Sequence, residues 1–275
     1  MKLTKTLIAL ALAGAAFSAQ AHKPWLLPSS TLVDSKEPWV TFDAAISEDL
    51  FDIDHQPLKL DALTVIGPDG SAVPLQNAQT GRLRSTFDIK MDKPGTYKVQ
   101  LVQQSVNASW KANGEVKRFR GTEEAFAKDV PANAEELKVS RTSSRLESFV
   151  SANKTDDAVF KPTGKGLELV PVTHPNDMRA GEQATWRFLL DGKPAANQAF
   201  SLIPGGVRYR GTLGEIRQTT DAKGEITFTI PAAGMYLVSA SWPVIARPAQ
   251  PTPGQAPQMP PRRVTYAATV EVLPQ

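Results

Sequence analysis

The sequence predicts an all-β protein, and two observations support this expectation. Short runs rich in β-branched and aromatic residues alternate with Gly, Pro and Asp turn signals along most of the chain, which is typical of antiparallel β-sandwiches. The two halves also end alike, because residues 94–99 and 234–238 each place a Tyr-x-Val strand after a Gly turn. We therefore expect two Ig-like antiparallel β-sandwich modules.

The N-terminal module is expected over residues 22–105. Two turn signals divide its strands: Gly67-Pro68-Asp69-Gly70, and Lys93-Pro94-Gly95, in which proline presets φ and glycine accepts a positive φ. The strand-like runs of this module are residues 39–42, 63–66, 83–91 and 96–102.

A connector is expected over residues 106–164. Acidic residues in a first helical turn indicate a short helix at 122–128 with Thr122 as its N-cap, and polar sequence then leads to a strand at 145–152. The C-terminal Ig-like module follows at 165–275. The strand-like runs of that module are residues 167–171, 185–190, 200–203, 225–230, 235–241 and 266–273.

A proline-rich stretch interrupts the C-terminal module at residues 243–261. It contains seven prolines among Ala, Gln, Gly and Thr, a composition in which neither a strand nor a helix persists. We expect a polyproline-like or flexible loop there.

The first 21 residues are typical of a secretory signal peptide. Lys2 and Lys5 precede an uncharged apolar run at 7–17, and Ala19 and Ala21 provide the small residues that signal peptidase requires. The apolar run is too short to anchor the chain in a bilayer. We therefore expect export through the inner membrane to the periplasm, cleavage after Ala21, and a mature chain that does not span the membrane.

The composition argues against several function classes. The chain has no cysteine, so disulfides, thiolate metal sites and Cys nucleophiles are excluded. Two of its three net positive charges are Lys2 and Lys5, and no Lys/Arg cluster is interleaved with aromatic residues, so nucleic acid is not an expected partner. There is no nucleophile-elbow motif, Gly-rich phosphate loop or distinctive carboxylate pair, so we do not expect an enzyme.

The three histidines of the chain are the candidate metal ligands. Cleavage after Ala21 would give His22 a free α-amino group, with a reference pKa of about 8, so that amine and imidazole together could chelate one ion. His55 follows Asp54, which is either a further ligand or a group that orients the ring. His174 stands where a strand leads into a turn. The sequence leaves open whether the three converge, and each also fits an ordinary surface position.

Several short motifs occur in a recognisable order. Residues 21–28 read Ala-His-x-x-Trp-Leu-x-Pro, and further segments follow at 51–55, 81–87, 94–97, 167–171, 191–194 and 220–224. In these segments the chain resembles a family of exported bacterial proteins of unknown function, described as a periplasmic component of cobalt/nickel-type transport. The resemblance implies two β-rich domains and the handling of a divalent metal in the periplasm.

Three functions are compatible with these observations. The favoured one is a periplasmic protein that holds or delivers a divalent transition metal (Ni, Co, Cu or Fe), with an inner-membrane transporter or an outer-membrane receptor as partner. An alternative is an Ig-like envelope adaptor that binds a partner without metal. A minor alternative is a copper oxidase of polysaccharide built on a histidine brace, against which the scattered positions of the five tryptophans argue.

Overall fold

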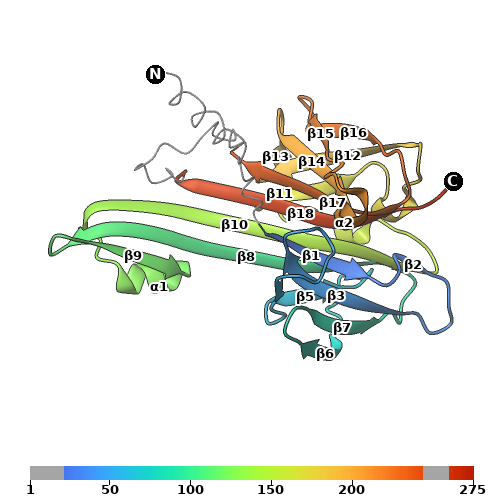
Figure 1. Ribbon diagram of the computed structural model, residues 1–275, viewed down its shortest axis with the longest axis horizontal. Coiled ribbons are helices and arrows are strands. Elements are labelled where there is room, and N and C mark those ends of the chain that lie inside the picture. Colours follow the sequence, from blue (N-terminus) through green and yellow to red (C-terminus); the bar gives the residue numbers. More distant parts are fainter. Residues whose placement is uncertain (1–21, 244–259) are drawn as a thin grey trace, which may run out of the picture.

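The computed structural model describes residues 22–243 and 260–275. Strands grouped in three sheets make up most of this part of the chain, which confirms the predicted all-β sandwich class (Figure 1). The expected signal peptide at 1–21 and most of the proline-rich stretch at 243–261 lie outside the described residues. Within the described residues, no helix is both long and apolar enough to cross a membrane.

A nine-stranded sheet runs through both halves of the chain. Its central strand, β10 (Glu135–Ala152), pairs antiparallel with β8 (Gly95–Ala112) on one side and parallel with β18 (Arg262–Val272) on the other. The remaining strands are β5 (Leu63–Ile66) beyond β8, and β17 (Gly234–Trp242), β14 (Ala199–Pro204) and β15 (Ile216–Thr219) beyond β18, with β2 (Leu32–Val33) and β9 (Glu115–Gly121) at its margins.

Two smaller sheets pack on the large one. The N-terminal sheet consists of β1 (Lys23–Pro28), β3 (Trp39–Ser47), β4 (Gln56–Pro57), β6 (Gln76–Thr80) and β7 (Ser85–Lys90). The C-terminal sheet consists of β11 (Leu167–Pro171), β12 (Gln183–Leu190), β13 (Lys193–Pro194) and β16 (Glu225–Thr229).

The smaller sheets cover opposite faces of the large sheet. Leu146 of β10 joins a core with Phe42 and Phe87 of the N-terminal sheet. Phe149, also on β10, joins a second core with Trp186 of the C-terminal sheet. Because side chains alternate along a strand, Leu146 and Phe149 point to opposite faces. Two sandwiches therefore share one continuous sheet.

The structure differs from the expected division at residues 106–164. This range contains the outer halves of β8 and β10, which extend beyond the sandwiches and form an arm with β9 (Figure 1). The arm is mostly polar, with apolar alternation only over a short stretch of β8 at Val106, Ala108 and Trp110, but the antiparallel ladder continues from Gly95 to Lys111. The short helix α1 (Glu123–Asp129) occurs where predicted, and the side chain of Thr122 accepts a hydrogen bond from the Ala125 amide.

A buried group of charged residues ties β10 to the C-terminal sheet. Arg145 lies 3.3 Å from Glu147 and 3.4 Å from Glu168, and all three side chains are buried. Tyr266 of β18 donates a hydrogen bond of 2.9 Å to Glu147. Burial acts to raise the pKa of Glu168, but hydrogen bonds from Thr163 and Gly164 and the charge of Arg145 lower it below its ordinary value. The Glu168 carboxylate is thus held ionised by specific partners.

Candidate metal site

The structure brings His22 and His55 together. Their rings stack face to face, with centroids 3.8 Å apart and planes 4° from parallel. His22 Nε2 also lies 3.3 Å from the carboxylate of Glu48. Both rings are exposed. We refer to His22 and His55 as the histidine pair.

The start of β1 fixes the position of His22. Lys23 is the register partner of Ser47, so His22 lies beside the point where β3 ends. Trp25 is fully buried, and its indole nitrogen donates a 2.7 Å hydrogen bond to the Ser47 hydroxyl, which in turn donates to the carbonyl of Asp49. These bonds tie β1 to the loop at residues 48–55.

Phe51 anchors the loop that carries His55. Its φ of 67° lies in the left-handed region, which bulky residues rarely adopt. The ring packs edge-on against Trp25, with centroids 5.6 Å apart, and it lies so close to Gly205 that a Cβ there would be 2.7 Å from Phe51 Cδ2. Packing therefore sustains an unfavourable backbone conformation, as is common at functional sites.

Asp54 closes the same loop. Its carboxylate accepts hydrogen bonds from the backbone amides of Glu48 at 3.2 Å and Asp49 at 3.3 Å. Both oxygens are thus engaged with the backbone. In this arrangement Asp54 positions the loop that presents His55.

His174 is not brought to the histidine pair. Its Nδ1 accepts a hydrogen bond from the Asn176 amide at 3.1 Å, and its Nε2 lies 3.0 Å from the Thr96 hydroxyl. The Asn176 side chain donates to the carbonyl of Thr31, beyond the far end of β1. A strand of six residues at about 3.3 Å each separates that end from His22 by roughly 20 Å. His174 caps the short helical turn η2 (Pro175–Asp177) at that place.

The chemistry of the histidine pair fits a borderline transition metal. Imidazole is a common ligand of Zn, Cu, Fe and Ni. Metal–nitrogen bonds are about 2 Å long and lie in the plane of the imidazole ring. The two rings are parallel with centroids 3.8 Å apart, so both side chains can reach one ion once one ring turns out of the stack. In the part of the chain that the structure describes, no three or more His, Cys, Asp or Glu side chains are grouped so as to hold a metal. A complete site there needs a further donor.

Sequence reasoning did not single out Glu48. The available signal was the density of carboxylates before His55, where Glu48, Asp49, Asp52 and Asp54 fall within seven residues. A dense acidic run is usually a solvated loop, so this signal alone does not identify a ligand.

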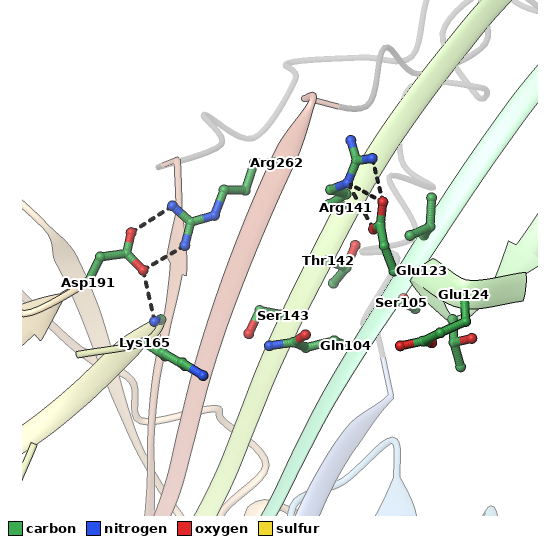
Figure 2. A pocket seen from close by; sticks show the side chains of 13 residues that line it. Gln104, Ser105, Glu123, Glu124, Arg141, Thr142, Ser143, Lys165, Asp191 and Arg262 are labelled. Carbon is green, nitrogen blue, oxygen red and sulfur yellow. Dashed lines mark hydrogen bonds and ion pairs between the residues drawn. The ribbon is translucent and has the colours of Figure 1, made fainter. Parts of the chain in front are cut away.

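Two hollows lie on the large sheet. The first, which we call the paired cleft, has a volume of about 440 Å³ and lies between α1 and the two turns that carry Lys165 and Asp191 (Figure 2). Arg141 and Arg262 are register partners on β10 and β18, yet their side chains turn to different carboxylates. Arg141 makes a two-pronged ion pair with Glu123, and Arg262 makes one with Asp191 (Figure 2).

The second hollow, which we call the hydroxyl groove, has a volume of about 620 Å³. His22 and Lys23 line it, so it adjoins the histidine pair. Glu215 and Arg217 of the β14–β15 region also contribute to its lining. The hydroxyl groups that line the groove belong to Ser144, Ser201, Ser239, Ser241 and Thr265.

Comparisons with known proteins identify the family. None of the curated proteins matches the chain. Among solved structures, the D0-D1 domain of Intimin matches with 14% identity over 90% of this chain and 97% of that chain, at a TM-score of 0.23. A DUF4785 family protein from Legionella pneumophila matches with 10% identity over 78% of this chain and 50% of that chain, at a TM-score of 0.24. The ICAM-5 D1-D4 ectodomain fragment matches with 11% identity over 92% of this chain and 51% of that chain, at a TM-score of 0.21.

These TM-scores are too low to carry an argument about fold or function. The family model described as "Domain of unknown function (DUF4198)" matches residues 19–243, which is most of the sequence. The chain therefore belongs to the DUF4198 family.

Proposed function

We propose that the protein binds a divalent transition metal through His22 and His55, and that it holds or delivers this metal in the periplasm. The observation that carries the proposal is the convergence of two histidines 33 positions apart in sequence into one exposed, stacked pair. The strained Phe51 and the hydrogen bonds of Asp54 hold the loop in the conformation that makes this contact.

The further donor is the α-amino group that cleavage after Ala21 would create on His22. Amine and ring of one residue can then chelate the ion, and the His55 ring, turned out of the stack, completes a set of three nitrogens. Such a set favours the tetragonal geometry of Cu(II) or Ni(II). The acidic loop around Glu48 adds negative charge, which raises the local concentration of cations.

The test uses the chain that begins at His22, titrated calorimetrically with Ni²⁺, Co²⁺, Cu²⁺ and Fe²⁺. We expect one ion per chain, and a loss of affinity of about 100-fold or more in His22→Ala and in His55→Ala, because each removes a direct ligand. His174→Ala is the matched control and should change the affinity less than twofold.

A further sample, with one residue added before His22, isolates the contribution of the α-amine to metal affinity. One extra residue before His22 converts the amine to an amide, so affinity should fall while the two rings still bind weakly. The proposal is wrong if no metal binds below about 1 mM, or if His174→Ala weakens binding as much as His55→Ala does.

The arm supports a second candidate, an envelope adaptor that needs no metal. The outer parts of β8, β9 and β10 extend beyond both smaller sheets (Figure 1), and Val116 on β9 is 61% exposed. An adaptor with this binding surface would lose partner binding when the arm is shortened, while the metal affinity of the histidine pair would be unchanged. The two candidate functions are therefore separable in one set of variants.

A further inference from the structure

We propose that the hydroxyl groove binds a small polycarboxylate, and that the metal reaches the histidine pair as a complex with this chelator. The inference rests on the proposed metal site and names the form in which the metal is bound. Three features of the groove carry it: an uncovered sheet face, unpartnered hydroxyl groups, and an excess of positive charge beside the acidic loop.

The groove exists because the two sandwiches use opposite faces of the shared sheet. The C-terminal sheet covers the face of β17 and β18 that carries Val238 and Tyr266. The opposite face of the same strands carries Ser239, Ser241 and Thr265, which are only half-buried. A small core around Trp25 and Leu237 packs against one end of that face and leaves the rest open.

The floor of the groove presents aligned hydrogen-bonding groups. Ser241, Thr265, Ser144 and Gln103 are successive register partners across β17, β18, β10 and β8. Among the described residues, the hydroxyls of Ser144, Ser239 and Thr265 have no protein partner that satisfies them. A bound ligand with several oxygen acceptors could therefore hydrogen-bond to several adjacent strands at once.

The charged residues that reach the groove are mostly cationic. Arg217 pairs with Glu215 at 2.9 Å, whereas Arg263 contacts only the hydroxyl of Ser241 at 3.3 Å and Lys23 makes no ion pair in the described structure. Partial burial acts to raise the pKa of Glu215, but hydrogen bonds from Arg217 and Ser201 and the charges of Arg217 and Lys23 lower it. With that carboxylate ionised, the cations still outnumber it.

One further cation of the groove lining, Arg145, adds no positive charge to the groove. Arg145 lines the groove with part of its chain, but its guanidinium points to the other face and is neutralised by Glu147 and Glu168. Lysine and arginine side chains with neighbouring hydroxyls are good partners for carboxylates.

The polarity of the site matches that of a metal chelate. The loop at 48–55 is acidic, the groove is basic, and His22 belongs to both. A metal polycarboxylate carries a cation at its centre and carboxylate oxygens around it. Such a complex can place the metal at the histidine pair and its free carboxylates on Arg263, Lys23 and the hydroxyl floor.

The paired cleft on the other face lacks these properties. Its lining contains three cations and three carboxylates. Arg141 and Arg262 each make a bidentate ion pair with one of these carboxylates (Figure 2). An anion would have to displace those carboxylates. The cleft therefore serves as an internal control for the groove.

The experiment compares three probes by calorimetry at constant ionic strength: Ni²⁺ alone, citrate alone, and the preformed nickel–citrate complex. The variants are Arg263→Gln, on the groove, and Arg262→Gln, its sequence neighbour on the opposite face. Arg263→Gln should weaken nickel–citrate and citrate binding at least tenfold and change Ni²⁺ binding less than twofold. Arg262→Gln should change all three less than twofold.

The two proposals fail in different ways. If Ni²⁺ binds through His55 but Arg263→Gln leaves nickel–citrate binding unchanged, the groove inference is overturned and the metal site stands. If citrate binds through Arg263 while neither form of nickel binds, the metal site is overturned and the chelate inference with it. Arg263 is exposed, so its variant is expected to fold, and a second variant, Lys23→Gln, checks the same groove independently.

Discussion

The two hollows on the shared sheet differ in how their charges are satisfied. In the paired cleft, arginines on neighbouring strands each hold a carboxylate from another element. In the hydroxyl groove, Arg263, which follows Arg262 on β18, contacts the hydroxyl of Ser241 instead of a carboxylate. Arg262 and Arg263 are neighbours in sequence but serve opposite faces, because side chains alternate along a strand. Whether a charged residue of this sheet is neutralised therefore depends on the face to which its side chain points.

The largest effect is expected at the buried charges on the sheet face that also carries the paired cleft. Arg145→Met leaves Glu147 and Glu168 buried without their cation, so the free energy of unfolding should fall by about 3–5 kcal/mol. Chemical denaturation followed by circular dichroism measures this loss.

Arg141→Met is the matched control for that prediction. It removes an ion pair whose side chains are each about half exposed and screened by solvent, so it should cost far less stability than Arg145→Met. Equal losses of stability in the two variants would show that burial does not make the Arg145 ion pairs more important than the exposed Arg141 pair.

A smaller effect is expected at the contact that holds the metal-site loop. In Gly205→Ala the new Cβ meets the Phe51 ring, so stability should fall by about 1–3 kcal/mol and the affinity for Ni²⁺ should fall as the loop shifts. A double-mutant cycle with Phe51→Leu checks the cause, because the alanine should cost less once the ring is gone. If the stability losses of Gly205→Ala and Phe51→Leu are strictly additive, a clash between the new Cβ and the Phe51 ring is not the cause.

The smallest effect is expected on the wall of the paired cleft. Thr122→Ala removes the hydroxyl that accepts from the Ala125 amide and should destabilise α1 by about 1 kcal/mol. Hydrogen exchange at the amides of Ala125 and Phe126 should quicken by about fivefold, while Thr122→Ser retains protection. Metal and citrate binding should not change, since the groove lies on the other face. A change in either would show that the two hollows communicate.

Much of the fold was predictable because local patterns repeat on short scales. The Tyr-x-Val strands that contain Tyr97 and Tyr236 both occur, and both hydroxyls donate to a carbonyl four residues earlier. The helix capped by Thr122 also follows from local chemistry. The arm was missed because its one short apolar alternation, at Val106, Ala108 and Trp110, stands among polar residues, and the ladder between β8 and β10 stabilises its strands.

The candidate site was predicted in part. His22, His55 and Asp54 do lie in one region, but Asp54 is engaged with the backbone and His174 caps a turn beyond the far end of β1. No local spacing could separate these cases. Whether two histidines meet depends on the register of β1 with β3 and on the turn at Phe51, both of which are set by contacts distant in sequence.

The sequence by itself determined the all-β class, the absence of cysteine chemistry and the few side chains able to bind a borderline metal. These properties depend on composition and on alternation over a few residues. Only the tertiary structure decided that two sandwiches share one sheet on opposite faces, that His22 stacks on His55, and that a basic groove adjoins them. Those outcomes depend on which strands pair and which faces are covered, and the physical reason is that long-range packing selects among many pairings that are equally acceptable locally.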